Sequence, residues 1–371
     1  MASPERDRTY MNEALALARQ GRYGTSPNPT VGCVIVRDDK IVGRGFHTVA
    51  GAPHAEVAAL DSARGSTQGA CAYVTLEPCN HQGRTGPCTR ALIEAGIARV
   101  VYAVADPNPA VAGGGATELR QAGIDVVGGV EQAAAAWLNR GFIHRARTGR
   151  PWVRIKVAMS LDNRTAMANG ESQWITGEAA RADVQRLRAE SCAVLTGIGT
   201  ILADDPSLNV RDAAIDMAGR QPRRIILDSH LRTPPTARML ALSGDTYVIT
   251  RSDDADRASA LERAGATVSR VESRCGGFPA VPLDETLCLL ARLEVNHILV
   301  EAGSILTGAF LSADLFNELV LYVAPRLIGS QGRPGLNIES PSSLAETLQL
   351  GLYDLRRLDN DVAMSFTRYE D

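Results

Sequence analysis

The chain alternates between two hydrophobic patterns. Short apolar runs rich in β-branched residues favour buried strands, and stretches with apolar residues three or four positions apart favour helices. In the first half, the runs 31–36 and 41–47 flank Arg37-Asp38-Asp39-Lys40 and predict a hairpin. Further strands are expected at 71–78, 99–109 and 124–129, and helices at 9–20, 54–64, 89–96 and 131–148. Repeated strand–helix alternation predicts an α/β sandwich.

The second half begins after Thr148-Gly149-Arg150-Pro151, where glycine and proline end the preceding helix. Val153, Ile155, Val157 and Met159 alternate as a strand, with Lys156 on the other face. Further strands are expected at 191–197, 223–234, 246–250, 296–304 and 315–325, and helices at 178–190 and 305–312, with a short helix within 199–211.

Glycines mark several connections between strands and helices. The turns 197–200 and 301–305 each lead from a strand into a helix, where backbone N–H groups can hold phosphate. Each turn alone is a weak indication of a cofactor site, because such turns are common in α/β proteins. We interpret Gly113 to Gly115 as a flexible loop, since the lysine and Ser/Thr of a P-loop do not follow.

Composition narrows the function classes. The 371 residues are 45% hydrophobic, with no continuous apolar run long enough to span a bilayer, and the N-terminal segment has no apolar core before a cleavage site. Seven cysteines at irregular spacings favour a reducing compartment, so we expect the cytoplasm. A net charge of −3 and the lack of a basic block indicate that neither nucleic acid nor a membrane is a partner.

Three metal-binding side chains and one acidic side chain stand out in the first half. His54, Cys79 and Cys88 could supply the three protein ligands of a catalytic zinc, which keeps a fourth position for water. Glu56 lies two residues after His54. The order His-x-Glu, Pro-Cys, Cys is typical of zinc-dependent nucleobase deaminases, in which the glutamate transfers protons and does not bind the metal.

The two cysteines are separated by NHQGRTGP, where the common pattern has two residues. We expect this loop to bring His81 and Arg84 beside the metal, where they could contact a substrate, and to lead into a helix that begins near Cys88. Alternatively, His81 could be the fourth ligand of a closed structural zinc. Glu56 argues against that alternative, because a structural site has no use for it.

The segment Pro-Cys-Asn-His-x-Gly-Arg-Thr-x-Pro-Cys resembles the bifunctional deaminase-reductases of riboflavin biosynthesis. This resemblance implies that Asn28, in Asn-Pro-x-Val-Gly, faces the base of the substrate, although Asn-Pro by itself is more typical of a turn. The family also has the DPNP segment that contains Asp106 and Asn108. His47, His144, His230 and His297 are interpreted as packing or surface residues.

Five segments of the second half are similar to the reductase half of that family: KVAMSLDNRTA, GESQWIT, LADDPSLNVR, LDSHLRTP and VEAGSILTGAF. The similarity implies a dihydrofolate-reductase-like fold that uses NADPH. It implies cofactor contacts at Ala158, Trp174, Thr200, Asp204, Ser229, Gly303, Ser304, Ile305, Leu306, Thr307, Gly308 and Ala309. It implies substrate contacts at Ser172, Arg188, Leu208, Arg211 and Glu301, and the planar guanidinium groups of the two arginines suit a ribose phosphate.

The hydrophobic patterns predict two α/β domains, and the resemblance implies that they are a cytidine-deaminase-like α/β/α sandwich at residues 1–147, a zinc-dependent pyrimidine deaminase, and a dihydrofolate-reductase-like α/β domain at 151–371, an NADPH-dependent reductase. The expected substrate is a phosphoribosylaminopyrimidine, deaminated first and then reduced from ribosyl to ribityl. Lys156, Asp204 and Glu301 are unranked candidates for the proton donor of the reduction. We also expect a homo-oligomer. The rival hypotheses are a nucleic-acid or free-nucleoside deaminase and a non-catalytic binding protein.

Overall fold

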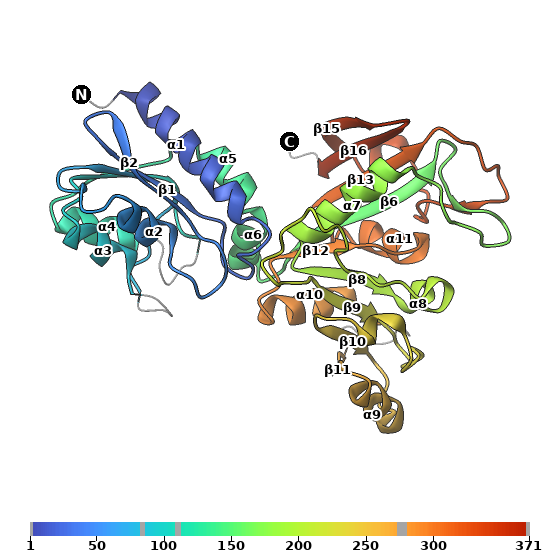
Figure 1. The fold of residues 1–371 in the computed structure, drawn as a ribbon. Helices are drawn as coiled ribbons and strands as arrows, with labels where there is room; N and C mark the ends of the chain where they lie inside the picture. Colours follow the sequence, from blue (N-terminus) through green and yellow to red (C-terminus); the bar gives the residue numbers. More distant parts are fainter. Residues whose placement is uncertain (1–2, 82–85, 108–112, 273–279, 369–371) are drawn as a thin grey trace. The chain divides into compact units, whose positions relative to one another are not determined.

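The computed structural model describes residues 3–81, 86–107, 113–272 and 280–368. The chain divides into two compact units, residues 1–149 with 216–219, and residues 150–215 with 220–371. Each unit has its own sheet and its own hydrophobic core (Figure 1). Among the described helices, none has both the length and the apolar character needed to cross a membrane.

The first unit contains a five-stranded sheet with the order β2-β1-β3-β4-β5. β1 is antiparallel to both β2 and β3, whereas β3, β4 and β5 are parallel. The strands are β1 Gly32–Arg37, β2 Lys40–Phe46, β3 Cys71–Leu76, β4 Arg99–Val104 and β5 Asp125–Gly128, and the helices are α1 Pro4–Ala18, α2 Ala55–Ser62, α3 Cys88–Glu94, α4 Gly114–Gln121, α5 Gln132–Leu138 and α6 Arg140–Thr148.

Helices cover both faces of this sheet (Figure 1). On one face, Met11 and Leu15 of α1 pack with Val34, Tyr73 and residues of α5 and α6. On the other face, α2, α3 and α4 pack against the remaining side chains of β1, β3 and β4. Side chains of successive strand residues alternate between the two cores, as the pleat requires. The predicted α/β/α sandwich is confirmed.

Glycine lets α2 lie directly on β2. A Cβ atom on Gly45 would lie 2.4 Å from both the Ala55 carbonyl oxygen and the Ala59 amide nitrogen, and one on Gly43 would lie 2.3 Å from the Ala59 carbonyl oxygen. Backbone therefore packs on backbone at this contact. The start of α2 is held at a fixed depth above the sheet.

The interpretation of Gly113 to Gly115 as a flexible loop was wrong for part of that run. Gly114 and Gly115 form the first turn of α4, and Gly113 precedes it in a left-handed conformation. A Cβ atom on Gly115 would lie 1.9 Å from the Pro78 carbonyl oxygen. These glycines allow α4 to approach the chain just after β3.

The second unit contains a nine-stranded sheet with the order β11-β10-β9-β8-β12-β6-β13-β16-β15. The strands from β11 to β13 are parallel, and β16 and β15 are added antiparallel at one edge. Its strands are β6 Trp152–Ser160, β8 Ala193–Gly197, β9 Arg223–Leu227, β10 Thr246–Thr250, β11 Ala266–Arg270, β12 His297–Val300, β13 Glu318–Ala324, β15 Leu350–Leu358 and β16 Asp361–Arg368, and a separate pair is β7 Arg164–Ala166 with β14 Arg333–Pro334.

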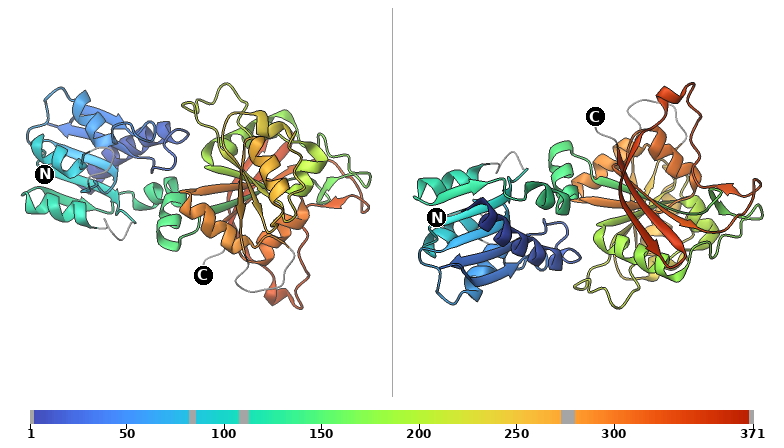
Figure 2. Two further views of the ribbon diagram at one scale, coloured as in Figure 1. Left: turned by 90° about the horizontal axis from the view of Figure 1, so that it is seen from below. Right: turned by 90° about the horizontal axis from the view of Figure 1, so that it is seen from above.

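Helices also cover both faces of the larger sheet. They are α7 Glu178–Glu190, α8 Ile198–Asp204, α9 Ala255–Arg263, α10 Leu283–Arg292 and α11 Ser304–Ser312. Helices α10 and α11 pack on one face, and α7, α8 and α9 pack on the other. Figure 2 shows the β15–β16 hairpin in red, which the sequence patterns did not predict. This mixed sheet, covered on both faces, agrees with the predicted reductase-type α/β fold.

A buried ion pair fastens α1 to the sheet of the first unit. Arg99 donates to both carboxylate oxygens of Asp7 at 2.8 Å, and the Tyr73 hydroxyl donates to the same carboxylate at 2.8 Å. The hydrogen bond from Arg99 holds the pKa of Asp7 below its ordinary value, despite the opposing effect of burial. The pair lies between α1, β3 and β4.

We predict that Asp7→Asn lowers the free energy of unfolding by about 2 kcal/mol at pH 7, because Arg99 then lacks its buried counter-charge. A carboxylate with a lowered folded pKa stabilises the fold above its unfolded pKa, near 3.8, and this contribution is lost as pH falls through the folded pKa. Urea unfolding at several pH values measures both effects. The control is Asp38→Asn on an exposed turn, which should change little. Equal stability of Asp7→Asn and wild type at pH 7 would contradict the prediction.

Candidate active sites

Three metal-binding side chains converge beyond the end of β3. His54 immediately precedes α2, Cys79 follows β3, and Cys88 is the first residue of α3. The amide of Thr89 donates to the Cys79 carbonyl at 3.1 Å, which ties the start of α3 to the end of the strand segment. The Nδ1 of His54 lies 3.3 Å from the Cys88 Sγ and 3.5 Å from the Cys79 Sγ. All three ligand atoms lie within 4.8 Å of one another.

These atoms fit a zinc ion. Zinc binds imidazole nitrogen at about 2.0 Å and thiolate sulfur at about 2.3 Å, so a tetrahedral ion separates such ligand atoms by about 3.5 Å. The His54–cysteine distances of 3.3 and 3.5 Å match that spacing. Three ligands leave one position for water. His81 is exposed and does not belong to the cluster, so the closed structural site has no fourth ligand among the described residues.

The electrostatics of the cluster favour metal binding. The hydrogen bond from the Cys88 thiol lowers the pKa of Cys79 to about 4, against the effect of burial. The same bond, with burial, raises the pKa of Cys88. The environment of Cys79 therefore favours the thiolate form that a metal binds, and coordination by a metal ion deprotonates a thiol ligand outright.

Glu56 lies beside the cluster without being part of it. It stands in the first turn of α2 and is only 4% exposed. Burial, reinforced by the charge of Cys79, raises the pKa of Glu56 to about 7. A carboxyl group with that pKa can accept and release a proton at neutral pH, which is what a general acid–base residue requires.

His47 connects Asn28 with the metal-binding cluster. Its ring is buried, its Nε2 lies 3.0 Å from the Asn28 Nδ2, and it meets the His54 ring edge-on at a centroid distance of 5.5 Å. Asn28, predicted to contact the base, is thereby placed next to the cluster. The interpretation of His47 as a packing or surface residue missed these hydrogen bonds. The available signal was its position directly after β2.

Glu77 was also missed, although it belongs to the Leu-Glu-Pro-Cys segment. Its buried carboxylate accepts hydrogen bonds from the amides of Asp106 and Gly113, both at 3.2 Å, and of Ala116 at 3.0 Å. Glu77 thus joins the strand segment that carries Cys79 to both ends of the β4–α4 connection. Asp106 is itself buried, whereas Asn108 and Arg84 lie outside the described residues.

In the second unit, a charged cluster forms on the α7 face of the sheet. Arg188 donates through Nε and Nη2 to the two carboxylate oxygens of Glu301, at 2.6 and 2.9 Å. The Nζ of Lys156 lies 3.9 Å from Glu301. Glu301 is held ionised, because Arg188 and Lys156 outweigh burial and lower its pKa to about 2. Burial lowers the pKa of Lys156.

The loop that carries Leu208 and Arg211 reaches this cluster. Arg188 donates to the Asn209 carbonyl at 3.0 Å, and the Arg211 guanidinium donates to the Asn209 side chain at 3.2 Å. Leu208 is buried with a left-handed backbone, and Arg211 is exposed. Four of the five predicted substrate residues of this unit therefore come together. No described contact links Ser172 to them.

Two glycine turns lie side by side in the second unit and fit a bound nucleotide. The Leu306 side chain lies 3.3 Å from where a Cβ of Gly197 would be, which joins the start of α8 to the start of α11. A Cβ on Gly303 would meet no atom within 4 Å. The hydroxyls of Thr196 and Thr307 are buried without a hydrogen-bond partner among the described residues. Open backbone and unused donors at a helix start suit a phosphate group.

The other predicted cofactor residues are spread around the second unit. The Trp174 ring is 61% exposed and lies under the Arg181 guanidinium, at 4.7 Å. The Ser229 hydroxyl accepts a hydrogen bond from the Val281 amide at 3.1 Å. The Ile305 side chain is exposed, and Gly308 packs closely against the backbone of Asn337. Ala158 is half-buried on β6, and Thr200 and Asp204 lie on α8.

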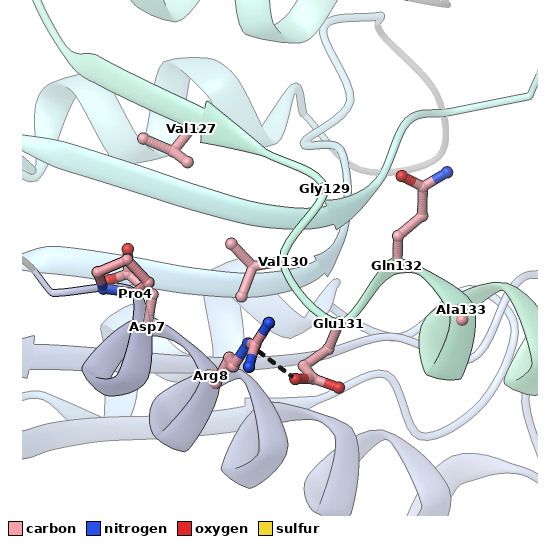
Figure 3. Close-up of a pocket in the computed structure, with 9 residues that line it drawn as sticks. All are labelled: Pro4, Asp7, Arg8, Val127, Gly129, Val130, Glu131, Gln132 and Ala133. Atoms are coloured by element: carbon pink, nitrogen blue, oxygen red, sulfur yellow. Dashed lines mark ion pairs between the residues drawn. The ribbon is translucent and has the colours of Figure 1, made fainter.

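A separate pocket of about 540 Å³ lies between the start of α1 and the segment after β5 (Figure 3). Arg8 and Glu131 approach to 3.8 Å across it. The pocket is lined by Pro4, Asp7, Arg8, Val127, Gly129, Val130, Glu131, Gln132 and Ala133. None of them is a predicted site residue, so this pocket is distinct from the chemistry at Glu56.

Comparison with known proteins shows the family to which the chain belongs. A family model described as the cytidine and deoxycytidylate deaminase zinc-binding region matches residues 4–104, and one described as the RibD C-terminal domain matches residues 151–364. The riboflavin biosynthesis protein RibD of Escherichia coli (strain K12) is 46% identical over 367 residues, covering 96% of this chain and 98% of that protein. The chain belongs to the RibD family.

Other RibD proteins are similar over the same length. RibD of Aquifex aeolicus is 41% identical over 368 residues, covering 98% of this chain and 99% of that protein. A structure of Acinetobacter baumannii RibD has a TM-score of 0.92 at 45% identity and covers 99% of this chain and 100% of that one. A diaminohydroxyphosphoribosylaminopyrimidine deaminase/5-amino-6-(5-phosphoribosylamino)uracil reductase from Thermotoga maritima has a TM-score of 0.85 at 32% identity, with 99% of each chain covered.

As a RibD-family member, the chain is a bifunctional riboflavin biosynthesis enzyme with a deaminase domain and a reductase domain. The cytidine-deaminase-like and reductase folds expected from the sequence are confirmed. So are zinc and NADPH as the cofactors of the two RibD domains.

We predict that Cys88→Ser lowers the zinc affinity of the RibD-family chain by more than about 100-fold, because serine replaces a thiolate ligand. Zinc content after dialysis against a weak chelator measures the loss. Cys71→Ser, a cysteine of the same unit outside the cluster, is the matched control and should retain one zinc per chain. Full zinc retention by Cys88→Ser would show that the ion binds elsewhere.

Proposed function

We propose that Glu56 and its metal site deaminate 2,5-diamino-6-(5-phosphoribosylamino)pyrimidin-4-one to 5-amino-6-(5-phosphoribosylamino)uracil, and that the second domain then reduces the ribosyl group to ribityl. The observation that carries the deaminase assignment is the position of Glu56, a buried carboxyl in the first turn of α2, two residues after His54 and beside three zinc-binding atoms. We assign the deaminase to residues 1–147 and the reductase to residues 151–371.

In the deaminase, His54, Cys79 and Cys88 would hold zinc, which supplies Lewis-acid activation of a water molecule. Glu56 accepts a proton from the attacking water and passes it to the ring nitrogen. It then takes the proton of the hydroxyl group added to the ring carbon and transfers it to the exocyclic amine, the carbon–nitrogen bond breaks to release ammonia, and the hydroxyl becomes the carbonyl of the uracil. Asn28 contacts the base, and His81, which is exposed, contacts another group of the substrate.

In the reductase, the turns at Thr200 and Gly303 would hold NADPH with the other predicted cofactor residues, and the dinucleotide supplies hydride to the anomeric carbon. The substrate also needs a proton. Glu301 is a poor donor, because its pKa of about 2 keeps it ionised. Asp204 is exposed on α8. Lys156 is a half-buried ammonium whose pKa is lowered by desolvation, so it is the donor we favour.

The two arginines take different roles in this proposal. The Arg188 guanidinium is engaged by Glu301 and the Asn209 carbonyl, so it positions the carboxylate that faces Lys156. Arg211 is more exposed and has a neutral side-chain partner, so it is better placed to bind the substrate phosphate. Ser172 and Leu208 complete the proposed substrate contacts.

We also propose a compartment and partners for the enzyme. Free thiols at the metal cluster suit the reducing cytoplasm. The substrate is a small phosphorylated molecule, and the net charge of −3 gives no attraction to nucleic acid. We also propose a homo-oligomer, which sedimentation analysis of the purified chain can test.

We predict that Glu56→Gln lowers ammonia release from the diaminopyrimidinone by at least about 10³-fold while zinc content stays at one per chain, because glutamine cannot transfer the proton. Ammonia is measured first, and NADPH oxidation is followed after the cofactor is added. The variant supplied directly with the uracil intermediate should oxidise NADPH at the wild-type rate. Ammonia release at the wild-type rate would remove Glu56 from the proposed mechanism.

We predict that Lys156→Met lowers reductase turnover by about 100-fold and leaves ammonia release unchanged. Wild-type reduction should slow as pH rises through the lowered pKa of Lys156, because the donor must be protonated, and the variant should lack this slope. Lys156→Arg keeps the positive charge beside Glu301 but releases a proton poorly. If Lys156→Arg were as active as wild type, the lysine would be needed only for its charge.

A further inference from the structure

His47 occupies a buried position between three parts of the deaminase site. It directly follows β2, and its backbone amide donates to the Val31 carbonyl at 2.9 Å. Its side chain is 3% exposed. Both ring nitrogens have partners: Nδ1 lies 3.1 Å from the Pro53 carbonyl oxygen, and Nε2 lies 3.0 Å from the Asn28 side-chain amide.

The Pro53 carbonyl decides which nitrogen of His47 carries the proton. A carbonyl oxygen can only accept, so the Nδ1 must be the donor. Burial disfavours the charged imidazolium, and in the neutral ring Nε2 is then an acceptor. Asn28 must therefore turn its NH₂ group towards His47. Its carbonyl oxygen is left facing away, and no described residue donates a hydrogen bond to it.

We propose that His47 is a positioning residue that fixes the orientation of the Asn28 amide, so that the deaminase site presents a hydrogen-bond acceptor, Oδ1, to the substrate. The inference rests on the proposed deaminase function and deepens it. The base must then offer an N–H group at Asn28, as the amino groups and ring N–H of a diaminopyrimidinone do.

This arrangement gives the site a selectivity that Asn28 alone lacks. A free amide can rotate by 180° and offer either its NH₂ or its oxygen. When Pro53 and His47 hold the Asn28 amide in this orientation, a base that presents a hydrogen-bond acceptor to Asn28 faces the Asn28 oxygen. Neither atom then carries a proton, so no hydrogen bond forms. A buried polar pair left in that state discriminates strongly between otherwise similar ligands.

A double-mutant cycle tests whether His47 acts through Asn28. We expect His47→Leu and Asn28→Ala each to lower deaminase kcat/KM by about 10–100-fold, mainly through KM, and the double variant to be no worse than Asn28→Ala. His47→Gln, whose side-chain oxygen can replace Nε2 as acceptor, should recover part of the activity. Zinc content and the reductase rate should stay at wild-type values throughout.

Three results would overturn the proposal: losses that multiply in the double variant, no recovery in His47→Gln, or loss of zinc in His47→Leu, which would make His47 a support for His54. Nitrogen NMR of histidine-labelled wild-type protein is an independent measurement. It should show a protonated Nδ1 and an unprotonated Nε2 for the resonance that His47→Gln removes. A protonated Nε2 would overturn the proposed role of His47. A wild-type protein that released no ammonia would instead refute the proposed deaminase function, so the two failures can be told apart.

Discussion

The first domain is organised by the need to bring three zinc-binding atoms within a few ångströms, although 34 positions separate His54 from Cys88. The fold meets this constraint by placing each ligand at or near the end of a helix or strand. His54 precedes α2, Cys79 follows β3, and Cys88 opens α3, so each side chain starts from a backbone point that a sheet or helix has already fixed. Glu56 gains its unusual proton affinity from the same packing, because the helix that positions His54 also buries the carboxyl group.

In the second domain, the neighbouring charges lower the pKa of a carboxyl group, whereas in the first domain burial raises it. Its parallel strands bring Lys156 on β6 to the residue after β12, and α7 adds Arg188 above them. Two cations around one carboxylate keep Glu301 ionised although it is largely shielded from solvent. The deaminase site therefore holds a carboxyl group ready to change its protonation state, whereas the reductase site holds one that does not. The same residue type serves two purposes because its neighbours differ.

The residues that could be predicted from the sequence are those whose role is evident from the type of side chain. Few side chains bind zinc, so His54, Cys79 and Cys88 could be recognised by type and order, and the turn Arg37-Asp38-Asp39-Lys40 marked the β1–β2 hairpin. It missed roles that depend on distant contacts. Glu77 matters through three backbone amides, His47 through Asn28, and the Arg188 guanidinium is engaged by Glu301, 113 positions away. The order of strands in the nine-stranded sheet could not be predicted for the same reason, because β8, β12 and β6 are neighbours in space but not in the sequence.

The close contact between β2 and α2 has a consequence for natural variation in this gene. Gly45 binds nothing and lies outside every motif, yet a single added methyl group would collide with the carbonyl of Ala55, the residue between His54 and Glu56. Relief of that collision must shift β2 or the helix start, and the helix start carries a metal ligand and the acid–base residue. An alanine allele at position 45 would therefore act on the deaminase, although no chemical group of the active site had been altered.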